Sequence, residues 1–414
     1  MIIILKVVEL FAGIGAWSKA LKRMNIDFEI VDAIEFDEKT MKSYNIIHNT
    51  NFKSKDITKI DPYDIPDCDI IFYSPPCQAF SVAGKQEGFG DSRGTLFFDA
   101  FKIIQAKKPK YAIMENVKGL TQKKFQFEFE TMIQLLEQEG YKNYWKVLNA
   151  KDYGIPQNRE RVFIVSIRED IEQEFEFPQP FDSGLRLRDL LENEVDEKYY
   201  ISEEKTKCLL QKYKKEIKNK DNNPSELSLN GKSISYCLDA HYGNGLAPSS
   251  INKGKRTHIL EVKPCITPDR INKKQNGRRF KEDGEPSFTI NTQDKQGILI
   301  IGLFDIKGNE QVRRVCGPEG ITPILNTMQD GNRKPKVLLF EKDGGYYFAS
   351  IRKFTPFECL RLMGFNDSDY IKLKKNKISD SQIYKMAGNS IVVNTIECLL
   401  KELPIFKNKF IEIQ

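Results

Sequence analysis

The sequence is poor in the residues that build metal centres and disulfide frameworks. Its 414 residues include three histidines and eight cysteines, and no two cysteines stand at C-x-x-C spacing. This scarcity argues against structural zinc, a histidine-rich metal site and histidine-based acid–base catalysis. The apolar start at Met1–Leu10 lacks a small-residue cleavage site and reaches Glu9 too soon to span a membrane. We therefore expect a buried strand there, reduced thiols and no metal.

The charge balance is mildly basic. With 64 basic and 58 acidic side chains, the formal net charge is +6, which suits a polyanionic partner without requiring one. Lysine, arginine and asparagine are dense in residues 252–281, and Arg313 and Arg314 follow as a pair. By itself, a charge run of this kind is most simply a solvated surface. Its role therefore depends on what the rest of the chain predicts.

The first 167 residues alternate short apolar runs with amphipathic stretches, such as KVVEL before AWSKALKRM and FEIVDAI before EKTMKSYNII. This alternation predicts an α/β fold in which helices cover both faces of a parallel sheet. Ligands of such sheets bind beyond the carboxyl ends of the strands. The turns FAGIG, IEFD, SPPCQ and MENV are all expected at these ends, which makes this edge the candidate site.

Composition divides the chain into three segments. A first domain is expected at 1–175, a polar region with short β-like runs at 176–348, and a helical segment at 349–414. In the last segment, Thr355 and Glu358 have the spacing of a capping box in front of an apolar helix. The last segment, QIYKMAGNSIVVNTIECLLKEL, then predicts a loop followed by a strongly apolar helix, which we expect to pack back on the first domain.

The first turn carries the marks of a nucleotide-binding turn. Gly13 and Gly15 permit close backbone approach of a ligand, and Glu35 follows at the end of the next apolar run, where it could bind ribose hydroxyls. A full dinucleotide fingerprint would have a third glycine where Ser18 stands, so a pyrophosphate is not called for. The alternative is a strand–helix turn that is merely tightly packed.

The third turn presents a thiol. Two prolines stiffen the backbone just before Cys77, at the edge of the sheet where ligands bind. A thiol in this place can act as a nucleophile, although an inert buried cysteine is the common case. The glycine-rich loop 84–95 follows and could close over a site.

Two further turns carry candidate acid–base and anion-binding groups. Glu115 comes directly after the apolar run YAIM, and a carboxyl at an apolar floor tends to have a raised pKa and can donate a proton. The basic turn from Gln157 to Arg161 offers planar guanidinium donors. Taken singly, each of these groups is as well explained by a surface salt bridge.

Taken together, these segments resemble the DNA (cytosine-5) methyltransferase family. ELFAGIG, AIEFD, SKDIT, SPPCQAFS, GTLFFDAFKII and MENVKGL are similar to its first six motifs, and YGIPQNRERVFIV, RKFTPFECLRLMGF and MAGNSIVVNT to its eighth to tenth. The resemblance covers roughly residues 5–168 and 350–400. It implies a Rossmann-like S-adenosylmethionine-dependent methyltransferase sheet at 1–175 and a smaller, mainly β or irregular target-recognition domain at 176–348, with 349–414 returning to the catalytic domain.

The resemblance also implies a mechanism. Cys77 would add to carbon 6 of a cytosine, Glu115 would protonate or hydrogen-bond ring nitrogen 3 and the amino group, and Arg161 would hold the carbonyl oxygen with support from Arg159. Carbon 5 would then take the methyl group of S-adenosylmethionine and release S-adenosylhomocysteine. Because a base inside a duplex cannot reach such a pocket, the target cytosine would be flipped out.

Two sets of binding residues follow from the resemblance, one from the matching motifs and one that also includes the basic region between the eighth and ninth motifs, where this family has its target-recognition domain. The implied methyl-donor residues are Phe11, Gly13, Gly15, Glu35, Phe36, Asp56, Ile57, Pro75 and Asn389. The expected DNA contacts are Gln78, Ser81, Arg93, Lys255, Arg256, Arg270, Arg278, Arg279 and Arg313. The chain departs from the family pattern at Ala16, where another glycine is usual, and at Ile391, where valine is common; both changes bear on donor affinity.

Three rival functions remain beside this reading. One is an RNA cytosine methyltransferase, which the long recognition region and the missing CFT tripeptide disfavour. Another is a catalytically silent DNA-binding regulator, which would need neither Cys77 nor Glu115. A nicotinamide-dependent dehydrogenase rests on the GxG turn alone. We expect a monomeric, cytoplasmic enzyme of a bacterium or phage acting on double-stranded DNA away from membranes; the recognition sequence and a partner restriction endonuclease stay open.

Overall fold

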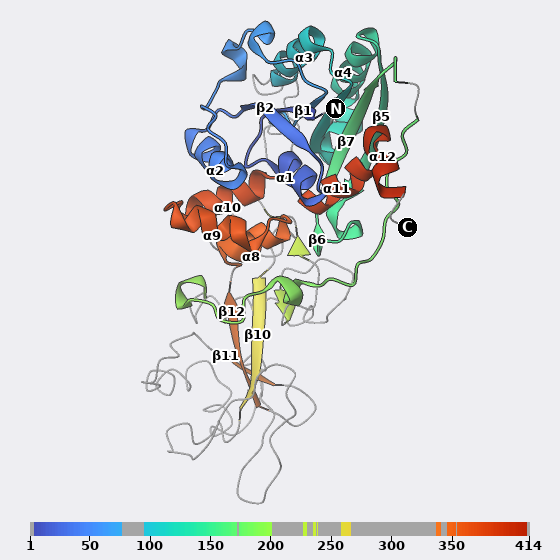
Figure 1. Cartoon of the computed structure of the whole chain (residues 1–414). Coiled ribbons are helices and arrows are strands. Elements are labelled where there is room, and N and C mark those ends of the chain that lie inside the picture. Colours follow the sequence, from blue (N-terminus) through green and yellow to red (C-terminus); the bar gives the residue numbers. More distant parts are fainter. Residues whose placement is uncertain are drawn as a thin grey trace, which may run out of the picture. The chain divides into compact units, whose positions relative to one another are not determined.

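The computed structural model of the chain describes residues 4–76, 95–171, 174–200, 227–229, 235–236, 238, 258–265, 337–340, 346–352 and 354–411 (Figure 1). Two compact units divide the chain. The first comprises Met1–Leu185, Leu238–Gly243 and Cys359–Gln414, and the second comprises Arg186–Cys237 and Asn244–Glu358. Among the described helices, none has the length and apolar composition that crossing a bilayer demands.

The first unit is built on a six-stranded sheet with the order β2-β1-β3-β4-β7-β5. Its strands are β1 (Leu5–Leu10), β2 (Phe28–Ile34), β3 (Ile70–Tyr73), β4 (Tyr111–Val117), β5 (Tyr141–Asn149) and β7 (Glu160–Arg168). Strands β1 to β4 pair in parallel, whereas β7 runs antiparallel to both of its neighbours. The sheet is therefore mixed.

The prediction of a parallel sheet is thus correct for the first four strands and wrong for the last pairings. The connection between β5 and β7 holds a short 3-10 turn, η7 (Ala150–Asp152), and the two-residue strand β6 (Gln157–Asn158). A parallel pairing needs a crossover of a dozen or more residues, usually a helix, and this connection is shorter. An antiparallel pairing of the two strands is the arrangement that such a connection permits.

Helices cover both faces of this sheet (Figure 1). The described helices of the first unit are α1 (Ala16–Arg23), α2 (Glu38–His48), α3 (Leu96–Lys107), α4 (Gln126–Gln138), α9 (Asp367–Lys375), α10 (Asp380–Asn389), α11 (Val393–Lys401) and α12 (Pro404–Ile411), while α8 (Pro356–Leu362) begins in the second unit and ends in the first. Short 3-10 turns are η1 (Ile57–Lys59), η2 (Pro62–Asp64), η5 (Lys118–Thr121) and η6 (Lys123–Phe125). The α/β class predicted from the alternating pattern is confirmed.

Alternating side chains of the strands serve the two faces. Tyr73 and Met114 belong to one core cluster, which the apolar sides of α3 and α4 complete. On the other face, the Trp17 ring of α1 stacks on Phe72 with ring centroids 4.5 Å apart, and α11 packs against α1. Helices α9 to α12 are therefore part of the first unit. The segment that starts at Gln382 was expected to open with a loop, but its first residues lie in α10, where Ser379 caps the first turn through the Gln382 amide.

The second unit holds a four-stranded sheet of order β11-β12-β10-β8. Its elements are η8 (Leu187–Leu190), η9 (Glu197–Tyr199), β8 (Leu227–Leu229), β9 (Ser235–Tyr236), β10 (His258–Cys265), β11 (Val337–Phe340) and β12 (Tyr346–Arg352). Beyond β12, the Thr355 amide donates to the Glu358 carboxylate at 2.8 Å, and the Glu358 amide donates to the Thr355 hydroxyl at 3.2 Å. The predicted capping box is confirmed. Arg352 pairs with the same buried carboxylate at 2.8 Å.

Candidate active site

A cavity of about 490 Å³ opens beyond the carboxyl ends of β1 to β4 in the first unit. Its walls come from the turns after these strands, from the start of β7 and from the end of α10. Its lining residues include Phe11, Gly13, Ile14, Glu35, Phe36, Asp37, Asp56, Ile57, Pro75, Pro76, Glu115, Asn116, Arg159, Arg161, Lys385, Gly388, Asn389 and Ser390. Sequence segments more than 300 residues apart thus share one hollow.

The turn after β1 forms one wall of the cavity, and its backbone is unusual. Phe11, Gly13 and Gly15 all have positive φ, at 56°, 56° and 76°. Phe11 is not a glycine, so the surrounding structure must hold it in this sparsely populated region. The Gly13 amide donates to the Glu35 carboxylate at 3.0 Å, and the Asp37 amide donates to its other oxygen at 2.9 Å. Burial raises the pKa of Glu35, and these two amides oppose the rise.

The absence of a third glycine in this turn has a structural reason. Ser18 donates both its amide, at 3.1 Å, and its hydroxyl to one oxygen of Glu9, and the Tyr44 hydroxyl donates to the same oxygen at 3.2 Å. Glu9 lies in β1 and is fully buried, and burial raises its pKa to about 7. The start of α1 is thus fixed by a buried carboxyl, an interaction that a glycine at this position could make only with its amide.

Gly15 is not among the residues that line the cavity. A Cβ atom at this position would come within 2.2 Å of the His48 ring and 2.7 Å of the Tyr44 ring. The glycine is therefore required by contacts behind the turn, on the side of α2. Of the predicted donor residues, the other eight line the cavity: Phe11, Gly13, Glu35, Phe36, Asp56, Ile57, Pro75 and Asn389.

Another part of the cavity wall carries a carboxyl and a guanidinium. Glu115 lies inside β4, not after it as expected, and its side chain pairs with Arg161 of β7 at 3.0 Å. This contact follows from the antiparallel pairing of β4 with β7, in which Val117 is opposite Arg161. Burial raises the pKa of the Glu115 carboxyl, while the neighbouring guanidinium groups of Arg161 and Arg159 oppose the rise. The pair can donate hydrogen bonds and, when Glu115 is protonated, a proton.

Arg159 lines the same wall but is turned toward main-chain carbonyls. Its two terminal nitrogens donate to Leu238 at 2.9 Å, to Gly388 at 3.0 Å and to Ser390 at 2.6 Å. Gly388 and Ser390 flank Asn389, which was predicted for the donor pocket. The guanidinium of Arg159 therefore holds the end of α10 against the cavity.

Sequence reasoning missed two groups that line the cavity, the exposed Lys385 and the buried Asn116. Lys385 of α10 pairs with Asp37 at 2.8 Å, and Asn116 donates to the Pro75 carbonyl at 3.3 Å. Asn116 stands beside Glu115 in MEN, so its position in the motif was a usable signal. For Lys385 no local signal exists, because its partner lies about 350 residues away.

Some predicted residues lie outside the part of the chain that the structure describes. They are the nucleophile candidate Cys77 and all the expected DNA contacts, Gln78, Ser81, Arg93, Lys255, Arg256, Arg270, Arg278, Arg279 and Arg313. The described segment 4–76 ends at Pro76, the residue before Cys77, and Pro76 lines the cavity.

Comparison with known proteins decides the family. The family model described as C-5 cytosine-specific DNA methylase matches residues 5–404. The chain belongs to this family of C-5 cytosine-specific DNA methylases. The orphan methyltransferase M.SPRI of Bacillus phage SPR is 32% identical, with 96% of this chain and 97% of that protein covered. The type II methyltransferase M.HhaI of Haemophilus parahaemolyticus is 31% identical, with 95% and 92% covered.

Solved structures agree on the fold of this methylase. The Dnmt2 methyltransferase of S. pombe is similar with a TM-score of 0.60 at 21% identity, covering 98% of each chain. At this identity the likeness concerns the fold alone. The family predicted from the motifs and the enzyme class, a DNA (cytosine-5-)-methyltransferase, are both confirmed.

Proposed function

We propose that this methylase transfers a methyl group from S-adenosylmethionine to carbon 5 of a cytosine that is flipped out of a short, specific double-stranded DNA sequence. The reaction passes through a covalent bond between Cys77 and carbon 6. The observation that carries the proposal is that the strained glycine turn and the Glu115–Arg161 pair face one cavity. A donor site and an acceptor site must share a hollow for direct transfer between them.

The donor side has groups that fit the chemistry of S-adenosylmethionine. Glu35 offers a half-buried carboxylate for the two ribose hydroxyls, and Phe36, which is 75% exposed, offers a free ring face for a base. Ile57 adds an apolar contact, and Asp56 caps η1 through the Thr58 amide and hydroxyl, which lower its pKa. When bound, the donor supplies an electrophilic methyl group on a sulfonium. The residues named here bind and orient it.

The acceptor side supplies what cytosine methylation needs. When the Cys77 sulfur bonds to carbon 6, the electrons of the ring double bond move toward nitrogen 3 and the carbonyl oxygen. Glu115, whose pKa burial raises, donates a proton or hydrogen bond at nitrogen 3, and Arg161 stabilises the oxygen. Carbon 5 then bonds to the methyl carbon, and the thioether leaves. Loss of the proton on carbon 5 breaks the carbon–sulfur bond and restores the aromatic ring.

Residues 176–348 are proposed as the target-recognition domain, in which Lys255, Arg256 and Arg313 contact DNA. The basic character of residues 252–281 supports this, since a polyanionic partner gives those charges a purpose. M.SPRI is named an orphan enzyme and M.HhaI a type II enzyme. These are the two settings expected here, without and with a restriction endonuclease, and the enzyme acts as a monomer in either.

The test is incorporation of labelled methyl from S-adenosylmethionine into unmethylated DNA and, separately, into transfer RNA, followed by bisulfite mapping. Wild-type protein should label DNA at one short motif, and Cys77→Ser should label none while still binding DNA. Label in RNA alone would move the enzyme to the RNA branch. DNA binding without label would favour a silent regulator.

A second measurement traps the covalent step. DNA carrying 5-fluorocytosine at the mapped position cannot complete the reaction, because fluorine cannot leave carbon 5 as the proton does. A denaturation-resistant protein–DNA adduct is expected with wild-type protein and not with Cys77→Ser. Methyl transfer without any adduct would overturn the covalent route and leave the activity standing.

A further inference from the structure

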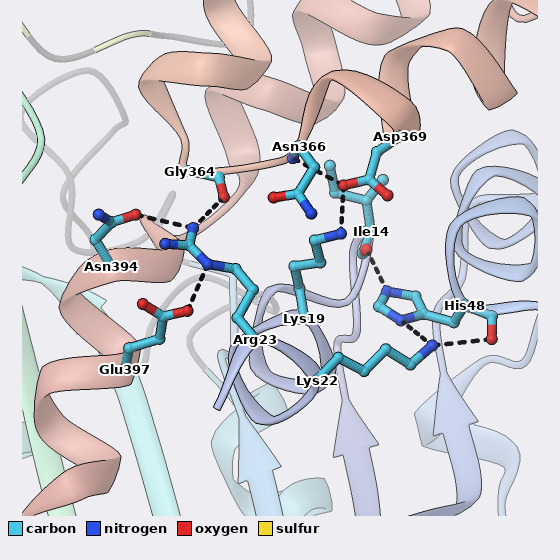
Figure 2. A network of polar contacts seen from close by, with 10 residues as sticks. All are labelled: Ile14, Lys19, Lys22, Arg23, His48, Gly364, Asn366, Asp369, Asn394 and Glu397. Atoms are coloured by element: carbon cyan, nitrogen blue, oxygen red, sulfur yellow. Dashed lines mark hydrogen bonds and ion pairs between the residues drawn. The ribbon is translucent and has the colours of Figure 1, made fainter. Parts of the chain in front are cut away.

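A histidine lies behind the donor turn and has no part in the proposed chemistry. His48 ends α2, is 5% exposed, and its Nε2 lies 2.9 Å from the Ile14 carbonyl oxygen (Figure 2). The same nitrogen lies where a Cβ atom at Gly15 would project. The ring therefore touches the turn at two successive residues, and the Ile14 side of that turn lines the cavity.

The geometry fixes which nitrogen carries the hydrogen. A carbonyl oxygen only accepts, so Nε2 must donate to Ile14. On the other side of the ring, the Lys22 ammonium lies 3.3 Å from Nδ1 and also donates to the His48 carbonyl at 3.0 Å. An ammonium only donates, so Nδ1 must accept. His48 is therefore a neutral ring whose single N–H points at the turn; burial, followed by the charge of Lys22, lowers its pKa to about 3.

The elements that flank the turn are held by independent contacts. In Figure 2, Arg23 at the end of α1 pairs with Glu397 at 2.6 Å and donates to the Gly364 carbonyl, and Lys19 pairs with Asp369 at 2.6 Å. These contacts fix α1 on the C-terminal helices. They do not fix the peptide groups of the turn that precedes α1. Glycines at positive φ let such peptide groups rotate at little steric cost, so other contacts must hold them.

Three polar backbone groups of the turn each have a hydrogen-bond partner. The Gly13 amide is held by Glu35 at 3.0 Å, the Gly15 amide by the Ala12 carbonyl at 2.8 Å, and the Ile14 carbonyl by His48. Of these three, the His48 contact alone comes from a side chain outside the cavity wall, because His48 does not line the cavity. It can therefore be altered without touching a bound donor.

We infer that His48 is a positioning residue for the methyl donor: its Nε2–H holds the Ile14 carbonyl and thereby the shape of the turn on which S-adenosylmethionine is bound. The inference rests on the proposed function, since it takes the ligand of this turn to be S-adenosylmethionine. It assigns His48 to donor affinity and to neither cytosine chemistry nor DNA binding.

The test measures binding of S-adenosylhomocysteine to the DNA-free full chain by calorimetry. His48→Phe keeps a ring but removes the Nε2–H hydrogen-bond donor. Because the buried Ile14 carbonyl is then unpaired, S-adenosylhomocysteine binding should weaken by about tenfold. His48→Gln places an amide N–H near the former Nε2 and should restore binding to within about threefold. Lys42→Ala, an exposed position on the same helix, should bind as wild type does.

Steady-state kinetics separate positioning from a general loss of stability. His48→Phe should raise KM for S-adenosylmethionine by the same factor and leave kcat at saturating donor, and KM for DNA, unchanged. If His48→Phe does not fold, His48→Asn, whose amide is too short to reach the Ile14 carbonyl, should show the same loss.

Three results would overturn the inference. They are wild-type affinity in His48→Phe, equal weakening in His48→Phe and His48→Gln, and a fall in kcat with unchanged donor KM. Wild-type protein that binds no S-adenosylhomocysteine would overturn both this inference and the proposed function. Wild-type protein that binds and methylates, with an unaffected His48→Phe variant, would overturn the inference alone.

Discussion

The two walls of the cavity are built by different means. The wall proposed to bind the methyl donor, here called the donor wall, is formed by the turn after β1, which has three positive φ angles, and by Glu35 at the end of the neighbouring strand, whose carboxylate accepts hydrogen bonds from the amides of Gly13 and Asp37. The wall proposed to bind the cytosine, here called the acceptor wall, depends on residues far apart in the sequence, because Glu115 and Arg161 meet only through the pairing of β4 with β7. We therefore expect substitutions that strain the backbone to have the larger effect on the donor wall, and substitutions that remove a single charged group to have the larger effect on the acceptor wall.

The largest effect is expected on the acceptor wall. Glu115→Gln keeps the shape of the side chain but cannot give a proton to nitrogen 3, so kcat should fall by about 10²- to 10⁴-fold. The comparison of walls requires that donor binding survive, so S-adenosylhomocysteine affinity should stay within about threefold of wild type. A variant that loses donor binding together with activity would show that the two walls are one cooperative unit.

Backbone strain on the donor wall gives the next largest effect. Gly15→Ala places a Cβ atom 2.2 Å from the His48 ring at a φ of +76°, and overpacking with left-handed strain should cost about 2–4 kcal/mol of unfolding free energy. Gly13→Ala is the matched control, because its φ is +56° but nothing lies within 4 Å of the added atom. It should cost about 1–2 kcal/mol.

Urea unfolding followed by circular dichroism measures both glycine variants. Equal losses would mean that strain alone matters and that the His48 ring yields to the added methyl group. A loss smaller in Gly15→Ala than in Gly13→Ala would contradict the proposed packing behind the turn.

The buried carboxyl under the donor turn gives a pH-dependent effect. Because burial raises the pKa of Glu9 from 4.5 to about 7, the folded state binds the extra proton between these values, and stability falls as pH rises through that window. Glu9→Gln keeps an oxygen acceptor for Ser18 and removes the charge. It should therefore be more stable than wild type by about 1–3 kcal/mol above pH 7, and the difference should vanish near pH 4.5.

Thermal melting of wild type and Glu9→Gln from pH 4.5 to 8 gives this measurement. A constant difference across the range would point to packing and not to titration. An advantage that grows toward low pH would have the opposite sign and would show that the Glu9 carboxyl is ionised when folded.

The sequence was sufficient to place Gly13 and Glu35 at one cavity. Both are recognisable by spacing from one apolar run to the next, and the strand ends they follow are where parallel sheets bind ligands. The capping box at Thr355 was likewise readable, since its two residues interact over three positions. Periodicity and spacing report contacts of this range well.

Long-range geometry was out of reach of the same reasoning. The antiparallel pairing of β7 with β4 brings Arg161 into contact with Glu115, and Arg159, just before β7, donates to the Gly388 carbonyl. Neither contact can be predicted from local sequence pattern. Gly15 was assigned to the ligand because its position matched a motif, whereas the structure gives it a partner in His48. A glycine in a motif shows that the backbone needs room, and the structure shows which side needs it.

The smallest effect should come from the rim, where both walls meet solvent. Lys385 pairs with Asp37 at 2.8 Å, and the two side chains are 47% and 31% exposed, so the pair should contribute about 0.2–1 kcal/mol. Lys385→Ala should weaken S-adenosylhomocysteine binding about twofold, with the effect shrinking at 0.5 M salt because exposed charges are screened. A tenfold loss that salt does not reduce would mean that Lys385 contacts the donor directly. The donor wall would then depend, as the acceptor wall does, on a side chain from a distant part of the sequence. The two walls would differ only in the backbone conformation of the turn after β1.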